Sequence, residues 1–295
     1  MKFIKYTLTI AALCASMIAT AANEATLTIA SGPGGNLNRY GIQLQTLLSR
    51  WLEQPVVLEF KPGAQGQIAA QHVAKTTATA PHFLLGLLSY DPKMDQTTEI
   101  VPVIGLGESA IVMFTHPDGP RSMREVLGSG NKNYSVGVLN TPLTFYSDGL
   151  IKAVSGRANF TKVPYNAFPQ QLSDILGKHL DIGISVPANI KSHLDAGTIR
   201  PLAVFNSRRL NNLPDTPTIK ELGVSFPQEN MQIHLIMWAS RSTPAATIEK
   251  VRREWKSWLT TQEGVQSLRS MDIVQPQEPA TTNPESMIKT LVPAK

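Results

Sequence analysis

The stretch "ATLTIASGPGGNLNRYGIQLQTLLSRWLEQPVVLEF", residues 25–60, joins two short β-rich runs through a glycine-rich turn and a helical pattern. Five apolar residues of the middle part recur at helical spacing and predict an amphipathic helix over 36–52: Ile42, Leu44, Leu47, Leu48 and Trp51. The flanking runs 25–30 and 55–60 predict strands. A strand–helix–strand unit of this kind builds a parallel sheet, so the stretch predicts an α/β protein.

The alternation of strand and helix patterns continues through most of the chain. "HFLLGLL" (82–88) predicts a third strand after a second helix, and "YSVGVL" (134–139) begins a second α/β series. A late strand, "HLIMWASR" (234–241), and a long helix from Pro244 follow that series. We expect two α/β lobes, with residues 22–120 plus 232–295 forming lobe 1 and residues 121–231 forming lobe 2.

The first 21 residues are typical of a secretory signal peptide. Lys2 and Lys5 precede an apolar stretch of about 13 residues, and Ala19-Thr20-Ala21 fits the small-residue rule for cleavage. The apolar stretch is short for a membrane span, so a retained anchor is the weaker alternative. We therefore expect residues 1–21 to be removed and the mature chain to work in the periplasm.

Cysteine and charge exclude several classes of function. The only cysteine, Cys14, lies in the signal peptide, so we expect no disulfide, thiol chemistry or cysteine metal site in the mature chain. Removal of Lys2 and Lys5 lowers the formal net charge from +5 to +3. The densest basic group, within 250–256, lies on the late helix pattern and indicates a solvated face. We expect no nucleic-acid partner.

The glycine-rich turn "SGPGGNLNRYG" (31–41) has three possible interpretations. A phosphate-binding loop would need a Lys-Ser or Lys-Thr pair after the glycines, and a dinucleotide-binding turn would need a small residue where Leu37 stands. Neither pattern is met, which argues against a nucleotide site here. Two interpretations remain: a carboxylate-binding site at the start of the following helix, and a plain tight turn. The sequence of the turn by itself does not distinguish between them.

No catalytic or metal-binding motif is present in the sequence. The six histidines form no H-x-x-x-H or H-E-x-x-H pair, and there is no G-x-S-x-G elbow. His72 falls in a predicted helix and His82 opens a predicted strand, so we interpret each as a structural residue. We expect no cofactor, no metal and no enzymatic activity, although a triad assembled from distant segments would leave no local motif.

Five segments that occur in order carry a family resemblance. They are "PGGNLNR" (33–39), "QPVVLEFKPGAQGQIAA" (54–70), "VPYN" (163–166), the long run 180–223 and "WASRSTPAATIEKV" (238–251). Together they resemble the substrate-binding proteins of tripartite tricarboxylate transporters, the Bug family of extracytoplasmic solute receptors. The resemblance implies a type II periplasmic binding fold, often called a Venus flytrap, with a small carboxylate held between two lobes.

The resemblance also implies a set of ligand-binding residues. Each lobe would contribute a loop that opens a helix, 31–38 in the first and 140–144 in the second. The residues implied are Ser31, Gly34, Gly35, Asn36, Asn38, Ser89, Tyr90, Asn140, Thr141, Thr144, Tyr165, Asn166 and Ser185. Asn38 departs from the family, which usually has an aspartate at this place. The loss of that negative charge from the cleft makes a neutral or more acidic ligand easier to hold.

The partners follow from the resemblance too. A receptor of this family would deliver its ligand to the membrane permease subunits of the transporter, and we expect it to be a monomer. A sensor that presents its ligand-bound state to a regulatory membrane partner is the alternative within the same fold. A hydrolase or transferase on a related fold is a third possibility, because a fold does not determine a function.

Overall fold

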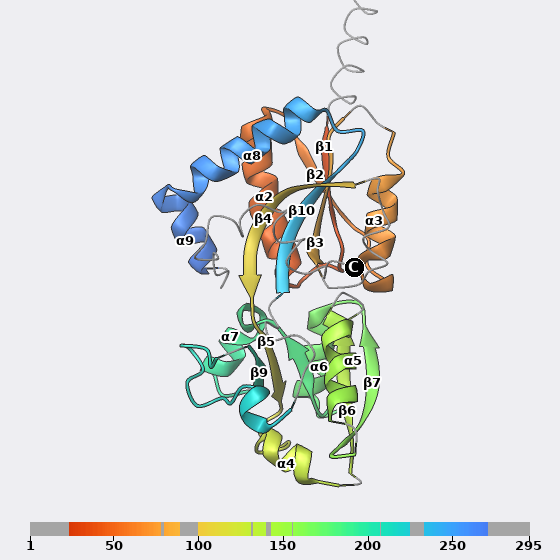
Figure 1. Cartoon of the computed structure of the whole chain (residues 1–295), viewed down its shortest axis with the longest axis vertical. Helices are drawn as coiled ribbons and strands as arrows, with labels where there is room; N and C mark the ends of the chain where they lie inside the picture. Colours follow the sequence, from red (N-terminus) through yellow and green to blue (C-terminus); the bar gives the residue numbers. More distant parts are fainter. Residues whose placement is uncertain are drawn as a thin grey trace, which may run out of the picture.

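The computed structural model describes residues 24–77, 80–88, 100–130, 132–139, 143–154, 156–206, 208–224 and 233–270. These residues form two lobes, one above the other in Figure 1. The expected signal peptide lies outside the described residues. Among the helices of the described residues, none has both the length and the apolar content needed to cross a membrane.

A five-stranded sheet forms the core of the first lobe. Its order is β2 (Val56–Phe60), β1 (Ala25–Ile29), β3 (His82–Leu88), β10 (Ile233–Ser240) and β4 (Ile100–Ser109). Strands β1, β2 and β3 are parallel, whereas β10 is antiparallel to both β3 and β4. The α/β class and the parallel arrangement of the first three strands are confirmed. Strand β10 runs in the opposite direction because it enters from the second lobe.

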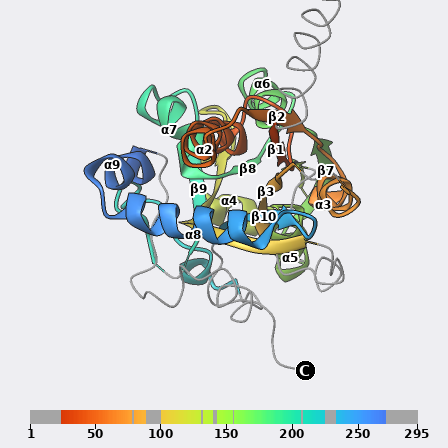
Figure 2. The ribbon, with the colours of Figure 1, turned by 90° about the horizontal axis from the view of Figure 1, so that it is seen from above.

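Helices cover both faces of this sheet. Helix α2 (Asn36–Leu52) and α3 (Gln67–Ala74) lie on either side of strands β1 to β3, as the view from above shows (Figure 2). Helix α8 (Ala245–Leu259) packs against α2 and β4, and α9 (Gln262–Ser270) follows it without having been predicted. A short 3-10 helix, η1 (Ala64–Gly66), leads into α3.

The first helix of the opening stretch packs closely on its strand. A Cβ atom at Gly41 would stand 2.6 Å from Ile29 Cδ1, so glycine permits the close approach of α2 to β1. Leu44, Leu47 and Leu48 are buried as expected. Ile42 was expected to be buried with them and is 51% exposed, because the buried stripe of α2 runs through Leu37, Tyr40 and Gly41 instead.

The second lobe combines an antiparallel and a parallel sheet. Strand β5 (Ile111–Thr115) lies between β8 (Gly183–Ser185) and β9 (Arg200–Phe205) and is antiparallel to both, whereas β6 (Asn133–Leu139) and β7 (Asn159–Tyr165) are parallel. A bridge from Val136 to Ile182 links the two sheets. The helices of this lobe are α4 (Met123–Gly128), α5 (Leu143–Ala153), α6 (Phe168–Leu176), α7 (Pro187–Asp195) and the 3-10 helix η3 (Lys220–Leu222).

The start of α4 shows how the sequence sets a helix end. The Ser122 hydroxyl accepts a hydrogen bond from the Glu125 amide at 3.2 Å, and the Glu125 carboxylate accepts one from the Arg121 amide at 2.9 Å. Both donors would otherwise be unpaired at the first turn. Ser122 is therefore the N-cap of α4.

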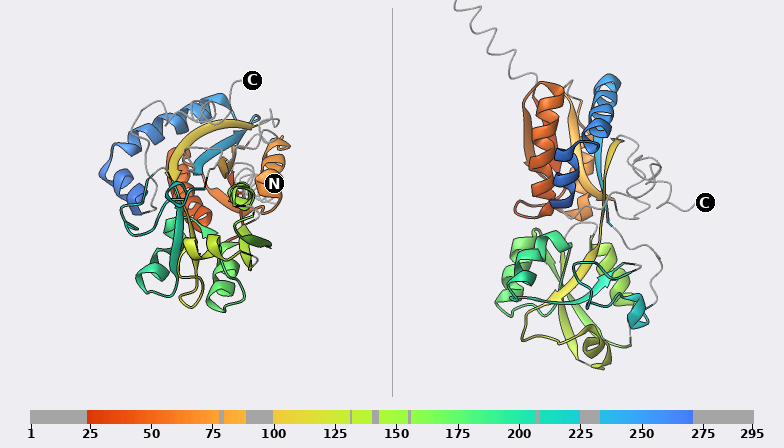
Figure 3. Two further views of the ribbon diagram at one scale, coloured as in Figure 1. Left: turned by 60° about the horizontal axis from the view of Figure 1, so that its bottom comes forward. Right: turned by 90° about the vertical axis from the view of Figure 1, so that its left-hand side faces the viewer.

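The chain passes between the lobes through the neighbouring strands β4 and β10, as two views show (Figures 1 and 3). Strand β4 ends at Ser109 in the first sheet, and β5 begins at Ile111 in the second. We therefore propose that lobe 1 gives way to lobe 2 at Ala110 rather than at residue 120. The return to lobe 1 would then lie before β10, whose first residue is Ile233.

Candidate functional site

A cavity of about 50 Å³ lies where the two lobes meet. The first lobe lines it with Ser31, Gly32, Gly35, Asn36, Leu37, Tyr40, Ser109 and Leu235. The second lobe lines it with Leu139, Asn166, Ala167, Phe168, Val186 and Asn189. A ligand held here would contact both lobes at once.

Three helices begin at this cavity. The N-cap residues of α2, α6 and α7 are Gly35, Ala167 and Val186, and all three line the cavity. None of the three N-caps makes a side-chain hydrogen bond to its helix, and none of the three helices has an acidic residue in its first turn. Their unpaired N–H groups and the positive ends of their dipoles are therefore available to an anion.

Helix α2 is 17 residues long, and its N-cap Gly35 and first two residues, Asn36 and Leu37, line the cavity. Helices α6 and α7 each have a proline in the first turn, which removes one N–H donor from each. Gly34 shapes the entry to α2 with a φ of +88°, a conformation that favours glycine.

The side chains that line the cavity are uncharged. Its polar members are the hydroxyls of Ser31, Ser109 and Tyr40 and the amides of Asn36, Asn166 and Asn189. A buried lysine or arginine would hold an anion tightly but would carry a large desolvation cost of its own. Dipoles and neutral donors instead allow an anion to bind and leave.

Asn36 combines burial with an open acceptor. Asn36 is only 5% exposed, and its Nδ2 donates a hydrogen bond to the Tyr40 hydroxyl at 3.1 Å. Its Oδ1 is buried and has no hydrogen-bond partner among the described residues. A buried acceptor without a partner is costly, so this oxygen favours a bound water or a ligand group that donates a hydrogen bond.

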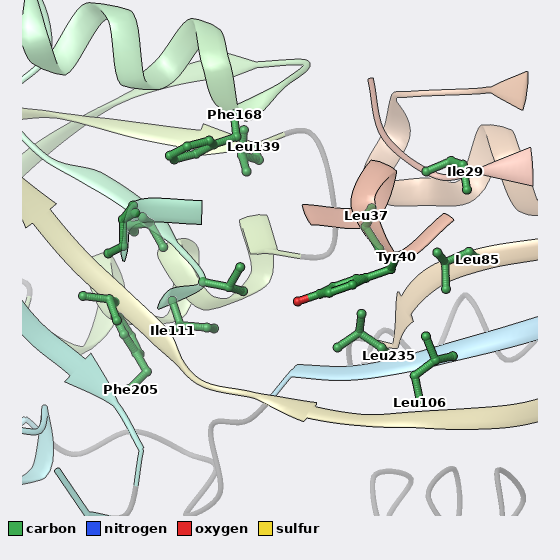
Figure 4. Packing of buried hydrophobic residues seen from close by; sticks show 14 of the residues in the cluster. Ile29, Leu37, Tyr40, Leu85, Leu106, Ile111, Leu139, Phe168, Phe205 and Leu235 are labelled. Carbon is green, nitrogen blue, oxygen red and sulfur yellow. The ribbon is translucent and has the colours of Figure 1, made fainter. Parts of the chain in front are cut away.

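Apolar side chains from both lobes form the rest of the wall. Figure 4 shows Leu37, Tyr40 and Leu235 on one side and Leu139 and Phe168 on the other, with the Tyr40 hydroxyl pointing toward the second lobe. A ligand with only charged groups would make no favourable contact with these apolar side chains. The site therefore fits a molecule with an anionic end and a hydrocarbon part.

Residues 41–290 match the family described as the tripartite tricarboxylate transporter family receptor. The chain belongs to this family. A UPF0065 protein of Bordetella pertussis is 25% identical over 268 residues, which cover 86% of this chain and 81% of that protein. The protein BugT of the same organism is 26% identical over 207 residues, covering 65% of this chain and 63% of BugT.

Solved structures share the fold. The periplasmic binding protein BugD superposes with a TM-score of 0.76 at 20% identity, covering 91% of this chain and 93% of BugD. A Rhodopseudomonas palustris protein solved with adipate has a TM-score of 0.76 at 24% identity and covers 91% and 92%. MatC from the same organism, with bound malate, has a TM-score of 0.75 at 18% identity and covers 91% and 95%. The fold is that of two-lobed periplasmic binding proteins, and the family consists of solute receptors rather than enzymes.

Four of the residues expected at the receptor's ligand site line the cavity: Ser31, Gly35, Asn36 and Asn166. Gly34 and Asn38 lie in the same turn and first helical turn but are not among the lining residues. The Ser185 hydroxyl lies behind the wall, where it accepts a hydrogen bond from Asn189 Nδ2 at 2.9 Å.

Tyr165 has a different partner. Its hydroxyl donates to the Asp174 carboxylate at 2.6 Å, and it is not among the lining residues. Burial and this hydrogen bond raise the pKa of the Tyr165 hydroxyl above its usual value. Four other expected residues lie outside the described residues: Ser89, Tyr90, Asn140 and Thr141. Thr144 lies in α5, and its side chain is likewise outside the description.

Several lining residues escaped the sequence reasoning. Asn189 is the third residue of α7, which directly follows strand β8, just as α2 follows β1. The same strand-to-helix pattern in the sequence could therefore have identified its position. Tyr40, Ser109 and Phe168 had no such signal. They reach the cavity only because the two lobes bring separate elements together.

Proposed function

We propose that this receptor captures a small organic acid in the periplasm and delivers it to the membrane subunits of a tripartite tricarboxylate-type transporter. Family membership supports the receptor role. The signal-peptide pattern of residues 1–21 supports export, with cleavage after Ala21 and Ala22 as the first mature residue.

The single observation that carries the carboxylate assignment is the meeting of three uncapped helix N-termini at one cavity. A carboxylate has two oxygens with about four acceptor sites, which matches a set of converging N–H donors. Each helix end contributes a partial positive charge of about half an elementary charge. Together they offset the charge of one carboxylate without a cationic side chain.

The body of the ligand is inferred from the rest of the wall. Leu37, Leu235 and Phe168 favour an aliphatic chain, and the open Oδ1 of Asn36 favours a hydroxyl or a protonated acid group near it. The relatives solved with adipate and malate are consistent with such ligands, since one has an aliphatic chain and the other a hydroxyl. We therefore propose a mono- or dicarboxylate of short chain length.

The test is a panel of mono-, di- and tricarboxylates, each paired with its uncharged amide of the same length. A ligand at 100 times its Kd stabilises the native state by about 2.7 kcal/mol. For a chain of this size that corresponds to a rise in Tm of about 5 °C or more. We expect at least one acid to give this rise and its amide to give none, with the affinity then measured by calorimetry.

Two results would contradict the assignment. If no acid in the panel raises Tm, the site does not bind small carboxylates. If an acid and its amide bind equally, the helix N-termini are not the source of recognition. Delivery to the transporter is a separate step, measured as uptake of the labelled acid by cells with and without the receptor.

A further inference from the structure

Three side chains of metal-binding type meet in the first lobe, away from the cleft. Glu59 comes from β2, His72 from α3 and His82 from the first position of β3. Glu59 Oε1 lies 2.7 Å from His72 Nε2 and 3.2 Å from His82 Nε2. One potential ligand atom from each residue lies within 4.8 Å of the other two.

The strand register brings the three together. Thr28 of β1 pairs with Glu59, and Thr26 pairs with His82. Residues two apart on a strand point to the same face, so Thr28, Glu59 and His82 share one face of the sheet. Leu27 and Ile29 point to the opposite face. Helix α3 covers the polar face and adds His72 to it (Figure 2).

Thr76, just after α3, sets the orientation of the His82 ring. The Thr76 hydroxyl donates to the His72 carbonyl oxygen at 3.2 Å, which uses its single hydrogen. Its oxygen also lies 2.8 Å from His82 Nδ1. When the Thr76 hydrogen points to the His72 carbonyl, Nδ1 is the donor in that contact. In this tautomer a neutral His82 ring presents the lone pair of Nε2 to Glu59.

In this tautomer the Thr28 hydroxyl cannot donate to both of the acceptors that it faces. Its hydroxyl donates to Glu59 Oε1 at 2.5 Å and lies 2.7 Å from His82 Nε2, but it has one hydrogen to give. Thr28 is fully buried, and the His82 side chain is only 9% exposed, so water has little access to this pair. A carboxylate oxygen and a nitrogen lone pair thus face each other at 3.2 Å, an arrangement that a cation between them would stabilise.

We propose that Glu59, His72 and His82 bind a Zn²⁺ ion, with water as the fourth ligand. Two histidines and one carboxylate are a common zinc ligand set, and Zn–N and Zn–O distances of about 2.0–2.2 Å place tetrahedral ligand atoms about 3.4 Å apart. The separation of Glu59 Oε1 from His82 Nε2 is already close to this value. His72 has to move outward by roughly 0.7 Å to reach it, and its side chain is 39% exposed on α3.

The surroundings fit a metal ligand set with a second layer of hydrogen bonds. The contact of His82 Nδ1 with Thr76 is the kind of partner that holds a metal-binding histidine in position. Lys61 Nζ lies 3.7 Å from the other carboxylate oxygen of Glu59, Oε2, and so leaves Oε1 to the ion. With His82 protonated, the same atoms would instead form an ordinary ion pair without a metal ion. A measurement of Zn²⁺ binding distinguishes these two arrangements.

This site is separate from the ligand cleft and has a structural consequence. Thr28, which contacts both Glu59 and His82, lies three residues before Ser31 of the cavity, about 10 Å along an extended strand. An ion here would join α3 to two strands in a chain whose only cysteine is Cys14. It would therefore stabilise the first lobe in the way that a disulfide stabilises other exported proteins.

The test uses the chain purified without a polyhistidine tag and treated with a chelator. We expect calorimetry to show one Zn²⁺ bound per chain and the melting temperature to rise by about 5 °C at saturation. Co²⁺ should give the intense visible absorption of a tetrahedral site. His72→Ala should weaken Zn²⁺ binding about 100-fold or more, and it leaves the fold intact because His72 lies on the surface of α3.

Matched variants test the position of the ion and the role of the hydrogen bond between Thr76 and His82. His193→Ala removes a histidine from α7 in the other lobe and should leave Zn²⁺ affinity unchanged. Thr76→Val should weaken it about 10- to 100-fold, and Thr76→Ser should restore it. Absence of Zn²⁺ binding would overturn the proposal and leave the cluster as an ion pair. Binding that survives in His72→Ala would place the ion elsewhere and overturn it equally.

Discussion

The backbone amide of Gly32, in the first lobe, donates a hydrogen bond to the backbone carbonyl of Asn166, in the second, at 3.3 Å. Both residues line the cavity, so the lobes are joined by main-chain atoms at the edge of the ligand site. A Cβ at Gly32 would stand 3.1 Å from that carbonyl oxygen and 3.2 Å from Ala167 Cβ. The contact therefore leaves little room for a side chain at Gly32, and we expect it to couple ligand binding to the approach of the lobes.

Gly32→Ala should weaken carboxylate binding about tenfold, the effect of roughly 1.4 kcal/mol of steric cost in the closed arrangement. Small-angle scattering with ligand present should show a larger radius of gyration than for the unchanged chain. Gly128→Ala is the control, because a Cβ there meets nothing within 4 Å. Equal affinity in Gly32→Ala would show that closure at this edge does not contribute to binding.

Gly35→Asp tests whether the start of α2 holds the anion. Gly35 has a φ of −104°, and a Cβ there lies 3.8 Å from Phe168 Cβ, so a side chain fits. Aspartate is a favourable N-cap residue, so the fold should be as stable as before or slightly more stable. Its carboxylate would compete for the same N–H groups and repel the ligand, and we expect at least a 100-fold loss of affinity by calorimetry.

Gly35→Asn is the matched control, since it has the same shape without the charge. Its affinity for the acid should fall about tenfold, because the asparagine amide also competes for the N–H groups of α2. An equal loss in both variants would assign the effect to blocked space rather than charge. Retained binding in Gly35→Asp would remove α2 from the ligand site.

A pair of variants distinguishes residues that line the cavity from those that support the lobe. Asn36→Ala should reduce ligand affinity about tenfold through the loss of one hydrogen bond. Tyr165→Phe should leave affinity unchanged but lower the free energy of unfolding by about 1–2 kcal/mol, since Tyr165 donates to the Asp174 carboxylate. A large affinity loss in Tyr165→Phe would return this residue to the ligand site, where the sequence reasoning had put it.

Local patterns predicted the elements better than their contacts. The turn at 31–36 was found because strand, glycines and helix follow one another in the chain, and four of its members line the cavity. Phe168 and Ser109 were missed because their positions depend on how the lobes meet. His72 and His82 were interpreted singly for the same reason, since only the register of β1 to β3 and the packing of α3 bring them together.

His234, on β10, gives the first lobe a predictable dependence on pH. Burial lowers the pKa of His234 to about 4, and the residue is 8% exposed. The unfolded chain takes up a proton at this histidine below about pH 6.5, whereas the folded chain stays neutral until about pH 4. Because the unfolded state then binds more protons, stability falls as the pH falls through this window, by about 1.4 kcal/mol per pH unit from this residue.

His234→Gln removes the titrating group and keeps a polar side chain of similar size on β10. We expect urea denaturation between pH 7 and pH 4 to show a shallower loss of stability in this variant, with a difference of up to about 3 kcal/mol at pH 4. Comparison of the two chains cancels the contribution of the carboxylates that they share. Parallel pH profiles would mean that His234 is protonated in the folded state, which its burial between β3 and β4 argues against.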